Sequence, residues 1–96
     1  MSELGDVALR IRSKNAGPFW ITVDIFCDAA GYAAVSAIPT EAFTRRLRVA
    51  EIMRFDLPDL EVVKLSLPRP RIQGSARDRD MHGAALAEVL RGMPVP

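Results

Sequence analysis

The stretch "RSKNAGPFWITVDIFCD", residues 12–28, joins a polar turn to the most regular apolar alternation in the chain. One face of this alternation is apolar, and the other mixes aromatic, polar and acidic side chains: Phe19, Ile21, Val23 and Ile25 against Trp20, Thr22, Asp24 and Phe26. A period of two predicts a strand over residues 18–27. The mixed face predicts a sheet surface that is only partly covered, or that is lined by a partner.

The segment before the turn has helical spacing. Leu4, Val7, Ala8 and Ile11 recur every three to four residues, which predicts a helix over residues 3–13. The turn that follows, Lys14-Asn15-Ala16-Gly17, has two interpretations. It either ends this helix, or it presents backbone and side-chain donors to an anion.

Two short helices are expected after the strand. In "DAAGYAAVSAI", residues 28–38, Asp28 suits a helix N-cap, and Pro39 ends the segment. In "TEAFTRRLRV", residues 40–49, Thr40 suits a cap, with Phe43 and Leu47 buried. These patterns predict consecutive helices between the first strand and the next.

The rest of the chain predicts a hairpin and a last helix. "EIMRFDL" and "LEVVKLSL", residues 51–57 and 60–67, alternate around Pro58-Asp59. "MHGAALAEVL", residues 81–90, has an apolar stripe that Gly92 and Pro94 terminate. The order helix–strand–helix–helix–strand–strand–helix predicts one α+β domain over residues 1–96. Its small, mainly antiparallel sheet has about three strands with helices on one side, and its free edges suit a second chain, including another copy.

Composition narrows the function classes. Thirteen basic and twelve acidic side chains nearly cancel, which gives no charge argument for nucleic acid. A single cysteine, Cys27, excludes an intrachain disulfide and thiolate zinc sites, and an inert buried thiol is expected. No apolar run approaches the roughly 20 residues of a membrane span, and the N-terminus lacks a signal core. We expect a cytoplasmic protein without metal or other cofactor.

Four parts of the chain carry groups capable of chemistry. In the turn, Lys14 supplies a charge while Asn15 and Gly17 allow close approach of a carboxylate or phosphate. Asp24 either faces solvent on the open side of the sheet or acts as an acid, a base or an orienting group. The arginine-rich stretch "RPRIQGSARDRD", which begins at Arg69, is a solvated loop, a docking arm or an anion clamp. The lone His82 leaves general acid–base chemistry open.

Three blocks of this sequence resemble a family of small bacterial proteins, domain of unknown function 4387. The blocks are "LGD" at residues 4–6, "RSKNAGP" at residues 12–18 and the strand motif carried by Thr22, Asp24, Ile25 and Phe26. Arg69-Pro70 and "GSARDRDMHGA" are similar to the closing loop of the family.

This resemblance implies a partnership with larger proteins of the acyclic-terpene-utilisation (AtuA) type. It suggests a small subunit that helps to build a lyase- or hydratase-like site for a carboxylate or acyl-CoA. The alternative is a non-catalytic module that stabilises the partner. In the first interpretation Lys14 and Asp24 are catalytic, and the substrate-binding residues are Ser13, Asn15, Ala16, Gly17 and Arg69.

Overall fold

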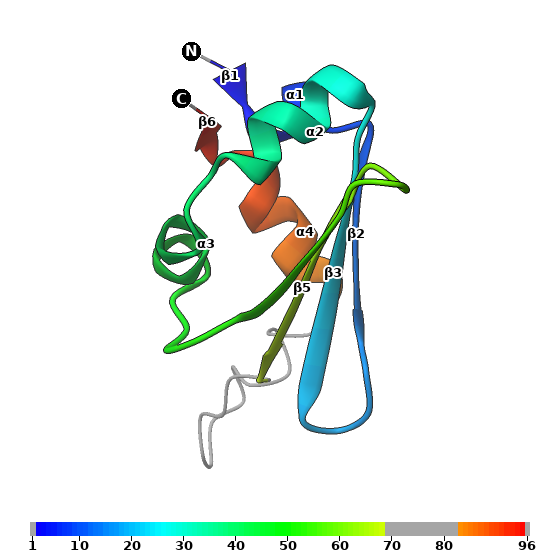
Figure 1. Cartoon of the computed structure of the whole chain (residues 1–96). Helices are drawn as coiled ribbons and strands as arrows, with labels where there is room; N and C mark the ends of the chain where they lie inside the picture. Colours follow the sequence, from blue (N-terminus) through cyan, green and yellow to red (C-terminus); the bar gives the residue numbers. More distant parts are fainter. Residues whose placement is uncertain (1, 69–82, 96) are drawn as a thin grey trace.

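The computed structural model describes residues 2–68 and 83–95, where helices pack on one face of an antiparallel sheet (Figure 1). The elements are β1 (Ser2–Glu3), α1 (Leu4–Val7), β2 (Arg10–Asn15), β3 (Trp20–Phe26), α2 (Ala29–Ser36), α3 (Thr40–Leu47), β4 (Met53–Leu57), β5 (Val62–Pro68), α4 (Gly83–Arg91) and β6 (Pro94–Val95). The main sheet has the order β2-β3-β5-β4, and β1 pairs separately with β6. The α+β class and the antiparallel sheet are confirmed, but the main sheet has four strands rather than about three.

The fourth strand comes from a segment that was predicted to be helical. Only α1 is helical there, and Ala8 after it is already extended. From Arg10 onward the chain pairs with β3, which places Ile11 opposite Ile25. The predicted helix over residues 3–13, and with it the predicted element order, is therefore wrong. Leu4 and Ile11 both reach the core, but they do so from two different elements.

The central strands confirm the alternation in the sequence from Trp20 to Phe26, whereas Phe19, which was expected on the apolar face, lies before β3 and is 53% exposed. Ile21, Val23 and Ile25 of β3 are fully buried, and each lies opposite a buried residue of β5. These partners are Leu67, Leu65 and Val63. Burial of an aliphatic side chain of this size stabilises the fold by about 1.5–3 kcal/mol, so this double row is the centre of the core.

The two central helices begin differently. At α2 the Asp28 Oδ1 accepts a hydrogen bond from the Gly31 N–H at 2.7 Å, which confirms the predicted N-cap. At α3 the N-cap is Pro39 and Thr40 is already helical, so the predicted cap at Thr40 is wrong by one residue. Phe43 and Leu47 are buried as predicted.

The last part of the chain closes the helical layer. The predicted hairpin around Pro58-Asp59 is confirmed, with β4 paired to β5. Helix α4 buries Leu86 and Leu90 against the sheet and ends before Gly92, after which β6 runs beside β1. No helix within the described ranges combines the length and apolar character of a membrane span.

Candidate functional site

The four strands present a second face, which we call the open face because the described helices pack only on the other side. Along each strand, the residues that alternate with the buried core residues belong to the open face, and the strand register shows which of them are neighbours. Three large apolar side chains are well exposed on it: Trp20 at 43%, Met53 at 53% and Phe55 at 45%. An exposed apolar group of this kind, mixed with charges, is typical of an interaction surface. The mixed outer face predicted for residues 18–27 is confirmed.

A row of charges crosses this face. Asp24 lies directly opposite Arg12 of β2 on one side and Lys64 of β5 on the other. The Asp24 side chain is half-buried, and within the described residues no ion pair shorter than 4.0 Å joins it to either cation. Arg54 of β4 lies on the opposite face of the sheet. Asp24 is therefore a carboxylate near two cations on an uncovered surface.

The turn before β3 is a hairpin loop rather than a helix end. The Ala16 N–H donates to the Trp20 carbonyl at 2.8 Å, which closes the loop. Gly17 has φ +76°, a conformation that glycine adopts without strain, and a Cβ there would meet no atom within 4 Å. The interpretation of this turn as a helix end is wrong, and the loop is exposed.

The predicted site residues divide between the two faces of the sheet. Lys14 lies on the open face opposite Thr22, and its diagonal neighbour is Asp24. Diagonal residues of an antiparallel pair are typically about 7–8 Å apart, within reach of a long side chain. Asn15 and Ser13 occupy the helix-side register. The Ser13 Oγ accepts a hydrogen bond from the Ala87 N–H at 3.1 Å, which fastens β2 to α4.

Lys14 and Asp24 are thus brought to one surface, while Ser13 has a structural contact on the other. Asn15, Ala16 and Gly17 lie at the exposed end of the hairpin. Arg69 and His82 lie outside the described residues.

Sequence reasoning placed Trp20 on the open face but did not identify the apolar residues that β4 adds to it, Met53 and Phe55. Trp20 and Met53 also line a small hollow of about 190 Å³, together with Glu51, Ile52, Ser66 and Pro68. In β4 the apolar residues face outward, and Arg54 and Asp56 face the helices. The available signal was the alternation of Arg54 and Asp56 with apolar residues, which marks two faces without saying which is buried.

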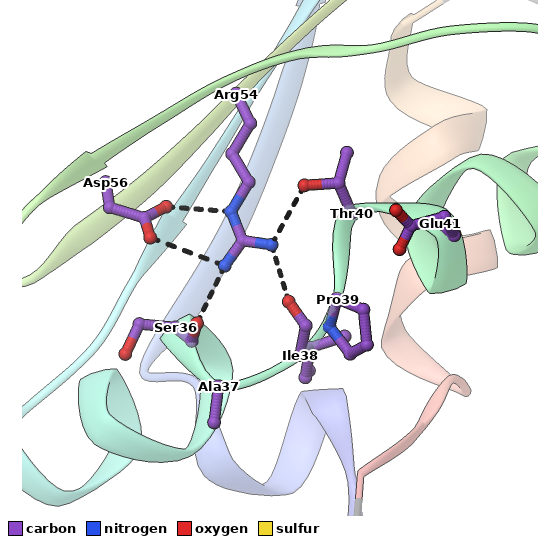
Figure 2. A pocket seen from close by; sticks show the side chains of 8 residues that line it. All are labelled: Ser36, Ala37, Ile38, Pro39, Thr40, Glu41, Arg54 and Asp56. Carbon is purple, nitrogen blue, oxygen red and sulfur yellow. Dashed lines mark hydrogen bonds and ion pairs between the residues drawn. The ribbon is translucent and has the colours of Figure 1, made fainter.

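A second hollow, of about 660 Å³, lies between β4 and the link from α2 to α3 (Figure 2). The Arg54 guanidinium points into it and donates to the carbonyls of Ser36 and Ile38, to the Thr40 Oγ1 and to both Asp56 carboxylate oxygens. These contacts use all the donor nitrogens of the guanidinium. Arg54 therefore holds the sheet edge against the two helices, a contact that we call the Arg54 clamp. Its guanidinium has no free donor for an anion.

Two groups near the core have altered acidity. Burial, with the nearby carboxylates of Asp28 and Glu61, raises the pKa of the Cys27 thiol. This confirms the expectation of a buried cysteine and favours the protonated, unreactive form. Partial burial, with the Asp56 carboxylate, also raises the pKa of Tyr32. Neither group lies on the open face.

The fold and the open face define a small α+β protein whose uncovered sheet surface combines aromatic and cationic side chains. Over residues 4–93 the chain matches the family model described as Domain of unknown function (DUF4387), and it belongs to that family. No curated protein and no solved structure is significantly similar to it.

Proposed function

We propose that this protein is a small subunit that docks through its open face on a larger protein of the AtuA type. In this proposal the complex acts on a carboxylate or acyl-CoA by lyase- or hydratase-like chemistry. The observation that carries the proposal is the exposure of Trp20, Met53 and Phe55 on a sheet surface that the described helices leave uncovered. Aromatic and methionine side chains are enriched at protein interfaces, where their burial supplies much of the binding energy.

The charges on the same face favour binding of an anionic ligand. Arg10, Arg12 and Lys14 follow one another on the outward side of β2, and all three are exposed. Lys64 adds a fourth cation from β5, and Asp24 is the only acidic residue that the four strands of the main sheet place on this face. Such a strip attracts a carboxylate or the phosphates of a coenzyme A moiety.

Within this strip Lys14 and Asp24 have complementary roles. The Lys14 ammonium binds the anionic group of the substrate, and the neighbouring loop at Asn15 and Gly17 allows that group to come close to the backbone. Asp24, with no direct ion pair among the described residues, orients the substrate or exchanges a proton with it. The partner supplies the remainder of the site, because this face is open.

The alternative function is a non-catalytic module that stabilises the larger chain through the same surface. One observation favours it: Ser13, from the block that resembles the family motif, holds β2 against α4. Part of that motif therefore serves the fold.

Co-purification tests the docking step. Co-expression with a larger protein of the AtuA type should give one stable complex, and Trp20→Lys should release the small chain. A matched control, Arg45→Glu, changes an exposed residue of α3 on the helical side and should leave assembly intact. A small chain that never associates with that protein contradicts the proposal.

Substitutions on the assembled complex separate the two functions. Lys14→Ala, Asn15→Ala and Asp24→Asn should each lower turnover of acyl-CoA or carboxylate substrates without loss of assembly. If activity survives all three changes in an intact complex, the stabilising module is the correct function.

A further inference from the structure

The two edges of the main sheet differ in their chemistry. The β2 edge carries the three outward cations Arg10, Arg12 and Lys14. Charged side chains of one sign along an edge discourage pairing with another copy of the same strand, since like charges would be opposed. The β4 edge instead has the exposed apolar residues Met53 and Phe55 on its outward side. An edge of this kind is open to another strand.

The backbone of β4 has room for such a strand. In an antiparallel ladder every second residue of an edge strand directs its N–H and C=O away from the sheet. Strand β4 pairs on one side with β5, and no other described strand pairs with it. The hollow of about 660 Å³ beside Arg54 and Asp56 leaves space next to this edge on the helix side.

We propose that the β4 edge is a self-association surface, where a second copy of this chain adds its own β4 in antiparallel fashion around a twofold axis at Phe55. This register places Phe55 opposite Phe55 of the second copy and Met53 opposite Leu57. It also places Arg54 opposite Asp56 twice, once on each side of the axis. Apolar residues then meet apolar residues, and neither Arg54 nor Asp56, which are already paired within each copy, lies opposite a like charge.

The neighbouring registers are worse for a specific reason. Centring the pair on Arg54 or on Asp56 opposes two cations or two carboxylates at the axis. A slip of one residue turns the second copy over, so that its helices would lie on the opposite side of the joined sheet. The sequence of β4 therefore selects the register centred on Phe55. The resulting eight-stranded sheet keeps both cationic β2 edges at its ends, away from the seam.

This self-association shares Met53 and Phe55 with the open face, but it needs no larger partner and can be measured on this chain alone. Sedimentation velocity of the full chain over a range of concentrations should show a monomer–dimer equilibrium. Phe55→Lys opposes two cations at the axis and should weaken the dimer by at least about tenfold. Trp20→Lys changes an exposed aromatic on the same face but in β3, and it should leave dimerisation within about twofold of the wild type. A dimer that Phe55→Lys does not weaken overturns the proposal.

Cysteine cross-linking tests the register. Residues directly opposite in an antiparallel pair have Cα atoms about 4.5–5.5 Å apart, a distance that a disulfide can bridge. Phe55→Cys should therefore form a covalent dimer on oxidation. Met53→Cys should not, because its copies would be displaced by about four residues of strand, on the order of 13 Å. A mixture of Met53→Cys and Leu57→Cys should cross-link. Cross-linking of Met53→Cys alone, or a wild-type chain that stays monomeric and uses this edge only for another protein, overturns the proposal.

Discussion

Replacement of Arg54 by methionine is the most direct test of how the sheet edge is joined to the helices. Arg54 is only 13% exposed, although it lies on an edge strand. Its guanidinium connects β4 to the end of α2 and the start of α3, and it stacks over the Phe43 ring at 5.4 Å. Methionine keeps the apolar part of the side chain and removes every donor.

The size of the effect follows from these contacts. Hydrogen bonds that involve a charged group contribute about 1.5–3 kcal/mol each, and the stacking adds about 0.5–1 kcal/mol. The two carbonyl bonds, to Ser36 and Ile38, are the main loss, and water entering the adjacent hollow offsets part of it. The bond to Asp56, which is 38% exposed, contributes little. We expect a loss of about 2–4 kcal/mol in the free energy of unfolding, a large share of the typical 5–15 kcal/mol.

Urea unfolding followed by circular dichroism measures this loss as a lower midpoint at an unchanged slope. Thermal unfolding should show a decrease of at least about 8 °C for a domain of this size. Arg45→Met, which removes an exposed arginine of α3, is the matched control and should change stability by less than about 0.5 kcal/mol. If Arg54→Met is as stable as the control, the clamp does not hold the edge in place, and the reasoning is refuted.

Three further outcomes are expected. Gly31→Ala should destabilise the fold by about 1–3 kcal/mol in urea unfolding, because the new Cβ would collide with the Val7 carbonyl where α2 crosses α1; unchanged stability would contradict that close approach. Asp28→Ala should cost about 1 kcal/mol through loss of the N-cap bond, whereas Asp28→Asn should retain most of it. Burial raises the pKa of the Cys27 thiol, so the folded state keeps its proton where the unfolded chain loses it, and stability should fall as pH rises above about 8–9. Cys27→Ala should remove this part of the slope in unfolding experiments repeated across that range.

The strands with strict alternation were predictable from the sequence. In β3 and β5 every second residue is a large aliphatic, so the period of two is clear and the buried face is unambiguous. The cap at Asp28 was also predictable, because its chemistry is local to the residues that it joins.

The strand β2 was not predictable in the same way. Within "RIRSKN" a cation recurs at every second residue, but only Ile11 is a large apolar residue, so this edge strand shows almost no apolar alternation. Leu4 and Val7 of the preceding turn then complete an apparent helical spacing with it. Residues 10–15 form a strand because they pair with β3. Strand formation depends on such tertiary contacts, which a local sequence pattern does not reveal.

In the candidate site, too, the features that depend on one strand were predictable and those that depend on tertiary contacts were not. The placement of Asp24 on the uncovered side followed from the alternation of its strand. The neighbours of Asp24 did not, because Arg12 and Lys64 meet it only through the register of three strands. Phe55 faces outward because its neighbour Arg54 forms its hydrogen bonds on the helix side. Those bonds depend on where α2 ends and α3 begins, which the sequence alone does not reveal.

The small ladder of β1 and β6 brings the two ends of the described chain together, with Ser2 opposite Val95 (Figure 1). Opposite residues in such a ladder are about 5 Å apart, so a linker of a few residues is long enough to join them. Circular permutation of this protein is therefore feasible. New ends opened in the exposed turn at Pro58-Asp59 would leave each strand of the main sheet intact.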